Sequence, residues 1–175
     1  AGPDGPPRRP DHDHDAEAGA WAPADGLERT LYTSIATIGT AIGFALILLA
    51  GMLAAGDRIN ETAAMAWGAA GFAAAGLAPA MGLAPEVPGL VAADLIERQQ
   101  WWVMTCVMTA AALWLFLRGK NPWLRLLAIP VLLAPHLWGA PHVALDATVR
   151  VPAELAARFA AVSLSVQAVL WLLTA

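Results

Sequence analysis

Long runs of residues without a single charge recur along the chain. Five such runs contain 27, 24, 19, 20 and 17 residues, and they cover residues 30–56, 62–85, 99–117, 126–145 and 159–175. A helix needs about 20 predominantly apolar residues to cross a bilayer, and each run is close to that length. The strands of a membrane barrel are about half as long and alternate in polarity, so helices are the expected elements.

The runs therefore predict an all-α fold, a multi-pass transmembrane helical bundle with five membrane segments. We expect these segments near residues 31–53, 63–82, 100–117, 123–138 and 155–175. The first run is apolar on every side, which a helix at the surface of a soluble bundle would not be. The alternative is a soluble helical bundle with a very apolar core. The membrane interpretation is favoured by tryptophans at the segment ends, where an indole places its N–H near water: Trp101, Trp102, Trp123 and Trp138.

Composition and charge support this picture and exclude several functions. Of the 175 residues, 58% are hydrophobic and 14% are charged, whereas a soluble domain carries about 25% charged residues. The net charge of −4 belongs to residues 1–29, which hold seven acids and three bases, while the remainder is balanced. Without a basic patch the chain is not expected to bind nucleic acid. Without a glycine-rich loop and its lysine it is not expected to bind a nucleotide, and no catalytic spacing indicates an enzyme.

The N-terminal part differs from the rest. Residues 1–24 are rich in glycine, proline and acids, which predicts a disordered acidic/histidine tail ahead of a transmembrane helical domain at 25–175. Within residues 11–15, two imidazoles alternate with three carboxylates, and such ligands suit divalent transition metals. His12 and His14 are therefore candidate metal ligands. The alternative is a solvated acidic linker.

Basic residues in the loops predict the orientation. The connection after the third segment carries Arg118, Lys120 and Arg125, and the connection after the first carries Arg58, whereas the other two connections carry one basic residue each. Short cytoplasmic loops are enriched in lysine and arginine. We therefore expect the first and third connections in the cytoplasm, and the N-terminal tail and the 135–152 loop at the outer face.

Two further histidines each follow a proline near the end of the fourth segment, at His136 and His142. Pro130 lies in the same segment, and a proline inside a helix frees a carbonyl one turn earlier. Transporters build binding sites where helices are broken at membrane depth, and a histidine at the membrane boundary is a functional candidate. We predict that these histidines bind a metal or carry protons. The alternative is that they cap a short interfacial loop.

The second connection contributes one more candidate ligand. Glu86 lies between Pro85 and Pro88, which fix the direction of its carboxylate. Farther along, Asp94 and Arg98 are four residues apart at the start of the third segment, so we expect them to form an ion pair on one helix face.

Seven motifs follow one another in a fixed order along the chain. They are the histidine/acid tail, residues 20–33 with Leu77-Ala78-Pro79 farther on, Leu-Ala-Pro-Glu-Val-Pro-Gly at 83–89, Arg-Gln-Gln-Trp-Trp at 98–102, Pro-His-Leu-Trp-Gly-Ala-Pro-His at 135–142 and Val-Pro-Ala-Glu-Leu-Ala at 151–156. In this order they resemble the CbtA family of predicted cobalt transporter subunits. The resemblance implies a multi-pass protein of the bacterial cytoplasmic (inner) membrane that is associated with cobalt uptake for cobalamin synthesis. Its expected partner is a small single-span histidine-rich membrane subunit (CbtB-like).

The resemblance also implies a hydrophobic helix ahead of the histidine/acid tail, which the printed sequence does not contain. Either that helix has been removed or the topology differs. Of the family's motif positions, Glu86, His136 and His142 are present here. Their role as metal ligands is an inference from their chemistry.

We therefore hypothesise a membrane permease subunit for uptake of a divalent metal, with cobalt as the expected ion. His12 and His14 would collect the ion at the outer face, and His136, His142 and Glu86 would pass it to a path between the helices. The metal is cargo, and no tightly bound cofactor is expected. Two alternatives are a haem-binding membrane electron carrier with His136 and His142 as haem ligands, and a non-transporting structural partner of a membrane complex.

Overall fold

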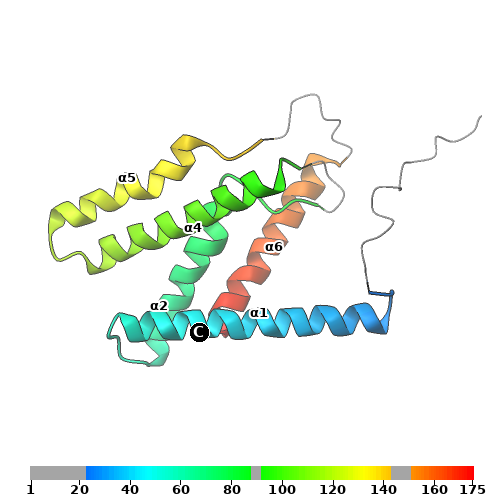
Figure 1. The fold of residues 1–175 in the computed structure, drawn as a ribbon, viewed down its shortest axis with the longest axis horizontal. Coiled ribbons are helices and arrows are strands. Elements are labelled where there is room, and N and C mark those ends of the chain that lie inside the picture. Colours follow the sequence, from blue (N-terminus) through cyan, green and yellow to red (C-terminus); the bar gives the residue numbers. More distant parts are fainter. Residues whose placement is uncertain (1–22, 88–91, 143–150) are drawn as a thin grey trace, which may run out of the picture. The chain divides into compact units, whose positions relative to one another are not determined.

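The computed structural model describes residues 23–87, 92–142 and 151–175. In these ranges every regular element is a helix (Figure 1). In chain order the elements are α1 (Leu27–Ala54), α2 (Glu61–Phe72), a π-helical turn η1 (Ala73–Leu77), α3 (Ala78–Ala80), α4 (Leu95–Arg118), α5 (Pro122–Trp138) and α6 (Ala153–Leu173). The predicted all-α fold is confirmed. Both ends of each of the five predicted segments lie within five residues of the ends of the corresponding helical segment. The tail histidines His12 and His14 lie outside the described residues.

Four helical segments are long and apolar enough to cross a membrane: α1, the continuous helix at 61–80, α4 and α6. The fifth, α5, has 17 residues, which corresponds to about 26 Å and is the lower limit for a span. Large apolar side chains of these helices point outward, as Ile35 does at 65% exposed and Val107 at 62%. A protein in water rarely exposes so much apolar surface, whereas the hydrocarbon core of a bilayer solvates it.

The chain divides into two compact units, residues 1–38 and 39–175, and the boundary lies within α1. In the first unit, Gly26 adopts a positive φ of 95° just before the helix. Asp25 then forms an ion pair with Arg29 at 2.8 Å. The second unit contains the rest of α1 and all the other helices.

Polar side chains determine where three of these helices begin. Asn60, Asp94 and Asn121 each accept hydrogen bonds from backbone N–H groups two or three residues later, at 2.9 to 3.1 Å. Such caps satisfy donors that the first helical turn leaves without a partner. Because Asp94 caps α4, this helix begins five residues before the predicted start of the third segment.

The helix at 61–80 is interrupted by the π turn η1. The N–H of Ala78 donates to the carbonyl of Ala73, five residues back, and Pro79 follows directly. Proline has no N–H and its ring clashes with the carbonyl four residues earlier, so a regular α-helix cannot accommodate it without distortion. Pro79 is less than 2% exposed, and η1 packs against α4 and α6. The irregular turn therefore lies in the interior of the second unit.

Two helix pairs form most of this interior. Helices α4 and α5 run side by side (Figure 1), joined by a short turn. The buried residues of α4 recur every three or four positions, as one stripe: Trp101, Thr105, Thr109 and Ala112. Helix α2 packs against α6, where small residues admit the large ring of Trp171. Close approach over small residues is typical of helices that associate in lipid.

Candidate functional site

Two of the predicted metal ligands line one cavity. Glu86, from the loop before α4, and His142, which follows α5, both face a cavity of about 460 Å³ that small residues of α6 complete. The second and fourth connections therefore lie at the same end of the second unit, as the alternating topology requires. A carboxylate and an imidazole are suitable ligands for a divalent transition metal. This cavity is the candidate metal site.

Glu86 is also the partner of an arginine. Its Oε2 lies 3.0 Å from Nη2 of Arg98, and the two side chains are 34% and 27% exposed. The prediction that Arg98 pairs with Asp94 is therefore wrong. The carboxylate of Asp94 is engaged by the backbone N–H groups of Ile96 and Glu97. Arg98 extends instead to the loop that precedes the helix.

His136 is held at a different place, at the end of α5. Its ring packs edge-to-face against Trp101, with 5.9 Å between the ring centroids. The indole N–H of Trp101 donates to the carbonyl of Pro135 at 3.2 Å, and the N–H of Gly139 donates to the same oxygen at 3.1 Å. Gly139 then turns the chain at a φ of 92°. His136 is not among the residues that line the cavity of Glu86 and His142.

The candidate site thus contains two candidate ligands, Glu86 and His142, in the described part of the chain. Within residues 23–87, 92–142 and 151–175, no group of three or more His, Cys, Asp or Glu side chains gathers closely enough to hold a metal ion. A further imidazole, thiolate or carboxylate ligand would have to come from another chain or from residues outside these ranges, where His12 and His14 lie. Two ligands leave most of the coordination sphere of an ion to exchangeable donors.

Two more cavities are related to the first one through shared lining residues. A cavity of about 340 Å³ is lined by Arg98 and Gln167, and it shares the stretch Leu83–Pro85 with the first cavity. A third, of about 860 Å³, shares Trp102 with the second. Along α6 the lining residues follow in order, at 156–160 for the first, 164–167 for the second and Trp171 for the third. Seven residues of helix correspond to about 10 Å, so the second cavity lies one to two turns farther along α6 than the first.

The third cavity ends at a polar cluster that the sequence patterns did not indicate. Arg118 in the last turn of α4 pairs with Asp57 in the loop after α1. The indole N–H of Trp67 donates to the same carboxylate oxygen at 2.8 Å, and the guanidinium lies over the ring of Trp114 at 5.4 Å. One signal was available, because Asp57 and Arg118 are the first charges after two long apolar runs. A charge at that boundary needs a partner.

Replacement of Asp57 by alanine should therefore destabilise the protein by about 2 kcal/mol, because it leaves both the Arg118 guanidinium and the Trp67 N–H without their acceptor. Thermal unfolding in detergent, followed by circular dichroism, measures the change. Glu61→Ala is the control, since Glu61 is an exposed acid at the start of α2. Equal shifts for the two variants would show that Asp57 contributes only its surface charge.

Comparison with known proteins gives one match. A family model described as "Probable cobalt transporter subunit (CbtA)" matches residues 2–175, which is nearly the whole chain. No curated protein and no solved structure matches the chain. Both loops that form the first cavity lie inside the matched region.

Proposed function

The chain belongs to the CbtA family, whose description is "Probable cobalt transporter subunit", and on this premise we propose that it is a membrane permease subunit for a divalent metal ion, with cobalt as its cargo. The observation that carries the proposal is the cavity that Glu86 and His142 both line. Four helices long and apolar enough to cross a membrane provide the setting. Two further cavities, each of which shares lining residues with the one before it, mark the direction in which we propose that the ion moves.

The chemistry of the site suits transient binding. A transported ion must be bound strongly enough to enter and weakly enough to leave. One carboxylate and one imidazole meet both conditions, because they offer the nitrogen and oxygen donors that a divalent ion prefers without enclosing it. In the proposed sequence of steps, His12 and His14 collect the ion from the outer face. Glu86 and His142 then receive it, and His136 is a separate position beside Trp101.

The proposed partner and the proposed location of the protein rest on the same family membership. The family description names a subunit, which implies at least one partner in a transporter complex. We propose that this partner is a small single-span histidine-rich subunit (CbtB-like) that supplies further imidazoles. The proposed location is the bacterial cytoplasmic membrane, with the 135–152 loop outside, because the connections richer in basic residues are then cytoplasmic.

Cobalt uptake by cells that express the complete system tests the proposal. His142→Ala and Glu86→Gln should each lower the initial uptake rate at limiting cobalt by about tenfold, the scale on which metal sites respond to altered ligands. Glu97→Gln is the matched control, because Glu97 is an exposed acid in the first turn of α4 that lines none of the three cavities. Its uptake should equal that of the unmodified protein.

A His136→Ala variant, measured beside His142→Ala, distinguishes the contributions of these two histidines to uptake. Normal uptake by the His136→Ala/His142→Ala double variant, at normal amounts in the membrane, would remove both histidines from the mechanism. A loss in Glu97→Gln as large as that in Glu86→Gln would instead assign the effect to general surface charge.

A further inference from the structure

The carboxylate of the candidate metal site is paired with a cation that belongs to the protein itself. We propose that Arg98 is a resident counter-cation, a charge that occupies Glu86 until a divalent ion displaces it toward the second cavity. This inference rests on the proposed function and adds a mechanism for the step from the first cavity to the second. Three features of Arg98 support it: its position between two cavities, the missing hydrogen-bond partner of its Nε, and a second acceptor that lines the same cavity.

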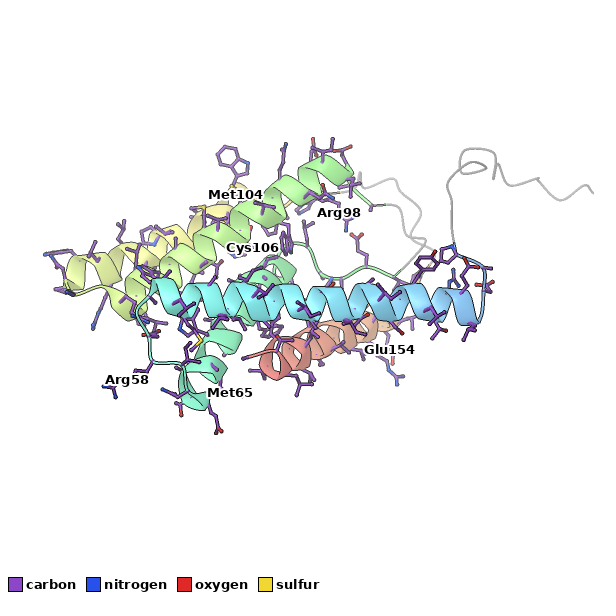
Figure 2. All side chains as sticks on the ribbon, turned by 60° about the horizontal axis from the view of Figure 1, so that its bottom comes forward. Arg58, Met65, Arg98, Met104, Cys106 and Glu154 are labelled. Carbon is purple, nitrogen blue, oxygen red and sulfur yellow. The ribbon has the colours of Figure 1, made fainter. Side chains whose placement is uncertain are left out.

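The ion pair stands where two cavities meet. Glu86 lines the first cavity and Arg98 lines the second, and their 3.0 Å contact lies beside the stretch 83–85 that both cavities share. Figure 2 shows Arg98 in the first turn of α4, at the end of the helix remote from Arg58. The pair therefore joins one residue of each cavity, a position in which its charges act on an ion in either cavity.

Arg98 is only partly satisfied in this position. Nη2 binds the carboxylate, but Nε is buried and has no hydrogen-bond partner in the structure. Arginine holds a carboxylate most firmly when two parallel N–H groups donate to it and the remaining donors are satisfied. A buried donor without a partner opposes this arrangement. The guanidinium is therefore held less firmly than in a fully satisfied pair.

A second acceptor lies within the same cavity. Gln167 of α6 lines the second cavity together with Arg98 and Gln99. The side-chain oxygen of Gln167 reaches the interior, since it lies 2.9 Å from the point where a Cβ on Gly76 would be. A neutral amide oxygen accepts a hydrogen bond from a guanidinium. A displaced Arg98 thus has a polar acceptor among the residues that line its own cavity.

Electrostatics sets the direction of the effect. A divalent ion at Glu86 and His142 brings two positive charges close to the guanidinium, and the two cations compete for a single carboxylate. While Arg98 is present, part of the attraction of Glu86 for the metal is lost to this competition. The resident counter-cation therefore weakens metal binding and favours release, and its removal should produce a tighter but slower site.

Binding of Co²⁺ to the purified full chain in lipid nanodiscs, measured by titration calorimetry, tests the inference. Arg98→Gln should tighten Co²⁺ binding about tenfold, the lower end of the effect that a neighbouring arginine has on cation binding by a carboxylate, and should lower cobalt uptake in cells. Arg98→Lys keeps the charge and should bind Co²⁺ nearly as the unmodified protein does. Tighter binding combined with slower uptake is a result that a purely structural role would not produce.

Two further variants make the test specific. In a Glu86→Gln background, Arg98→Gln should no longer tighten binding, because the carboxylate for which the cations compete is absent. Lys120→Gln is the matched control, since Lys120 is an exposed cation in the turn after the other end of the same helix and lines none of the three cavities. Its Co²⁺ affinity should be unchanged.

The outcomes separate this inference from the proposed function. Unchanged or weaker binding by Arg98→Gln, when His142→Ala also weakens binding, would overturn the counter-cation and leave the metal site intact. If neither His142→Ala nor Glu86→Gln alters Co²⁺ binding, the metal site itself fails. Tighter binding by both Arg98→Gln and Lys120→Gln would overturn the local competition in favour of a general charge effect.

Discussion

Replacement of Trp101 by alanine is expected to destabilise the protein by about 3 to 5 kcal/mol, the usual cost of removing a large buried aromatic side chain. Trp101 is only 5% exposed. Its ring lies against Gly82, where an added Cβ would come within 2.5 Å of it, and against His136. Its N–H is bonded to the carbonyl of Pro135. One side chain therefore joins α4, the loop after α3 and the corner that ends at His142.

Thermal unfolding in detergent, followed by circular dichroism, gives the size of the loss. Trp101→Phe should cost less, about 1 to 2 kcal/mol, because most of the ring remains and the N–H bond is lost. The neighbouring Trp102 is 43% exposed, so Trp102→Ala is a control that should destabilise the protein much less. Similar losses for the two alanine variants would contradict the assigned role of Trp101.

The loss should extend to function, because the corner at 135–142 positions His142. In Trp101→Ala protein that remains folded at low temperature, Co²⁺ binding should weaken along with stability. This result would link the packing of one buried indole to the geometry of a cavity that it does not line.

The helices were predictable because their signal is local. A membrane segment is defined by the absence of charge over about 20 residues, and such a run can be found without knowledge of any contact. The prediction that the connections alternate between two sides follows from the number of segments. Two contacts agree with it, since Asp57 meets Arg118 at one end of the unit while Glu86 and His142 share a cavity at the other.

The partners of the charged side chains were not predictable, because they depend on contacts between segments that are far apart in the sequence. Arg98 had an acid four residues away in the sequence, but the folded chain bonds that acid to the start of α4 and brings Glu86 to the arginine. Likewise, the sequence identified five candidate ligands, three of them in the described residues (Glu86, His136 and His142), but not the distances between them. Packing around Trp101 then places His142 at the cavity of Glu86 and holds His136 beside an indole.

The π turn at 73–77 is another feature that the sequence alone did not predict. Pro79 predicts a distortion of its helix, but a kink, a break and a π turn all accommodate a proline. Contacts of η1 with α4 and α6 accompany the last of these. The turn brings Gly76 close to Gln167 and so helps to form the second cavity.

Replacement of Gly71 by valine should destabilise the protein by about 3 kcal/mol, at the upper end of the range for overpacked interiors. A Cβ at position 71 would lie 2.4 Å from the ring of Trp171. That ring cannot withdraw easily, because it is 5% exposed and stacks on Phe44 with 4.1 Å between centroids. Valine would therefore separate α2 from α6 and disturb the surface along which the three cavities follow one another.

Gly43→Val is the matched control, because a Cβ at Gly43 would meet nothing within 4 Å. Its unfolding midpoint should stay the same or rise, since glycine is the weaker helix former. Trp171→Leu in the Gly71→Val background should recover part of the lost stability, because the smaller side chain makes room for the added methyl groups. Equal midpoints for the two valine variants, or no recovery in the double variant, would show that α2 and α6 do not depend on this contact.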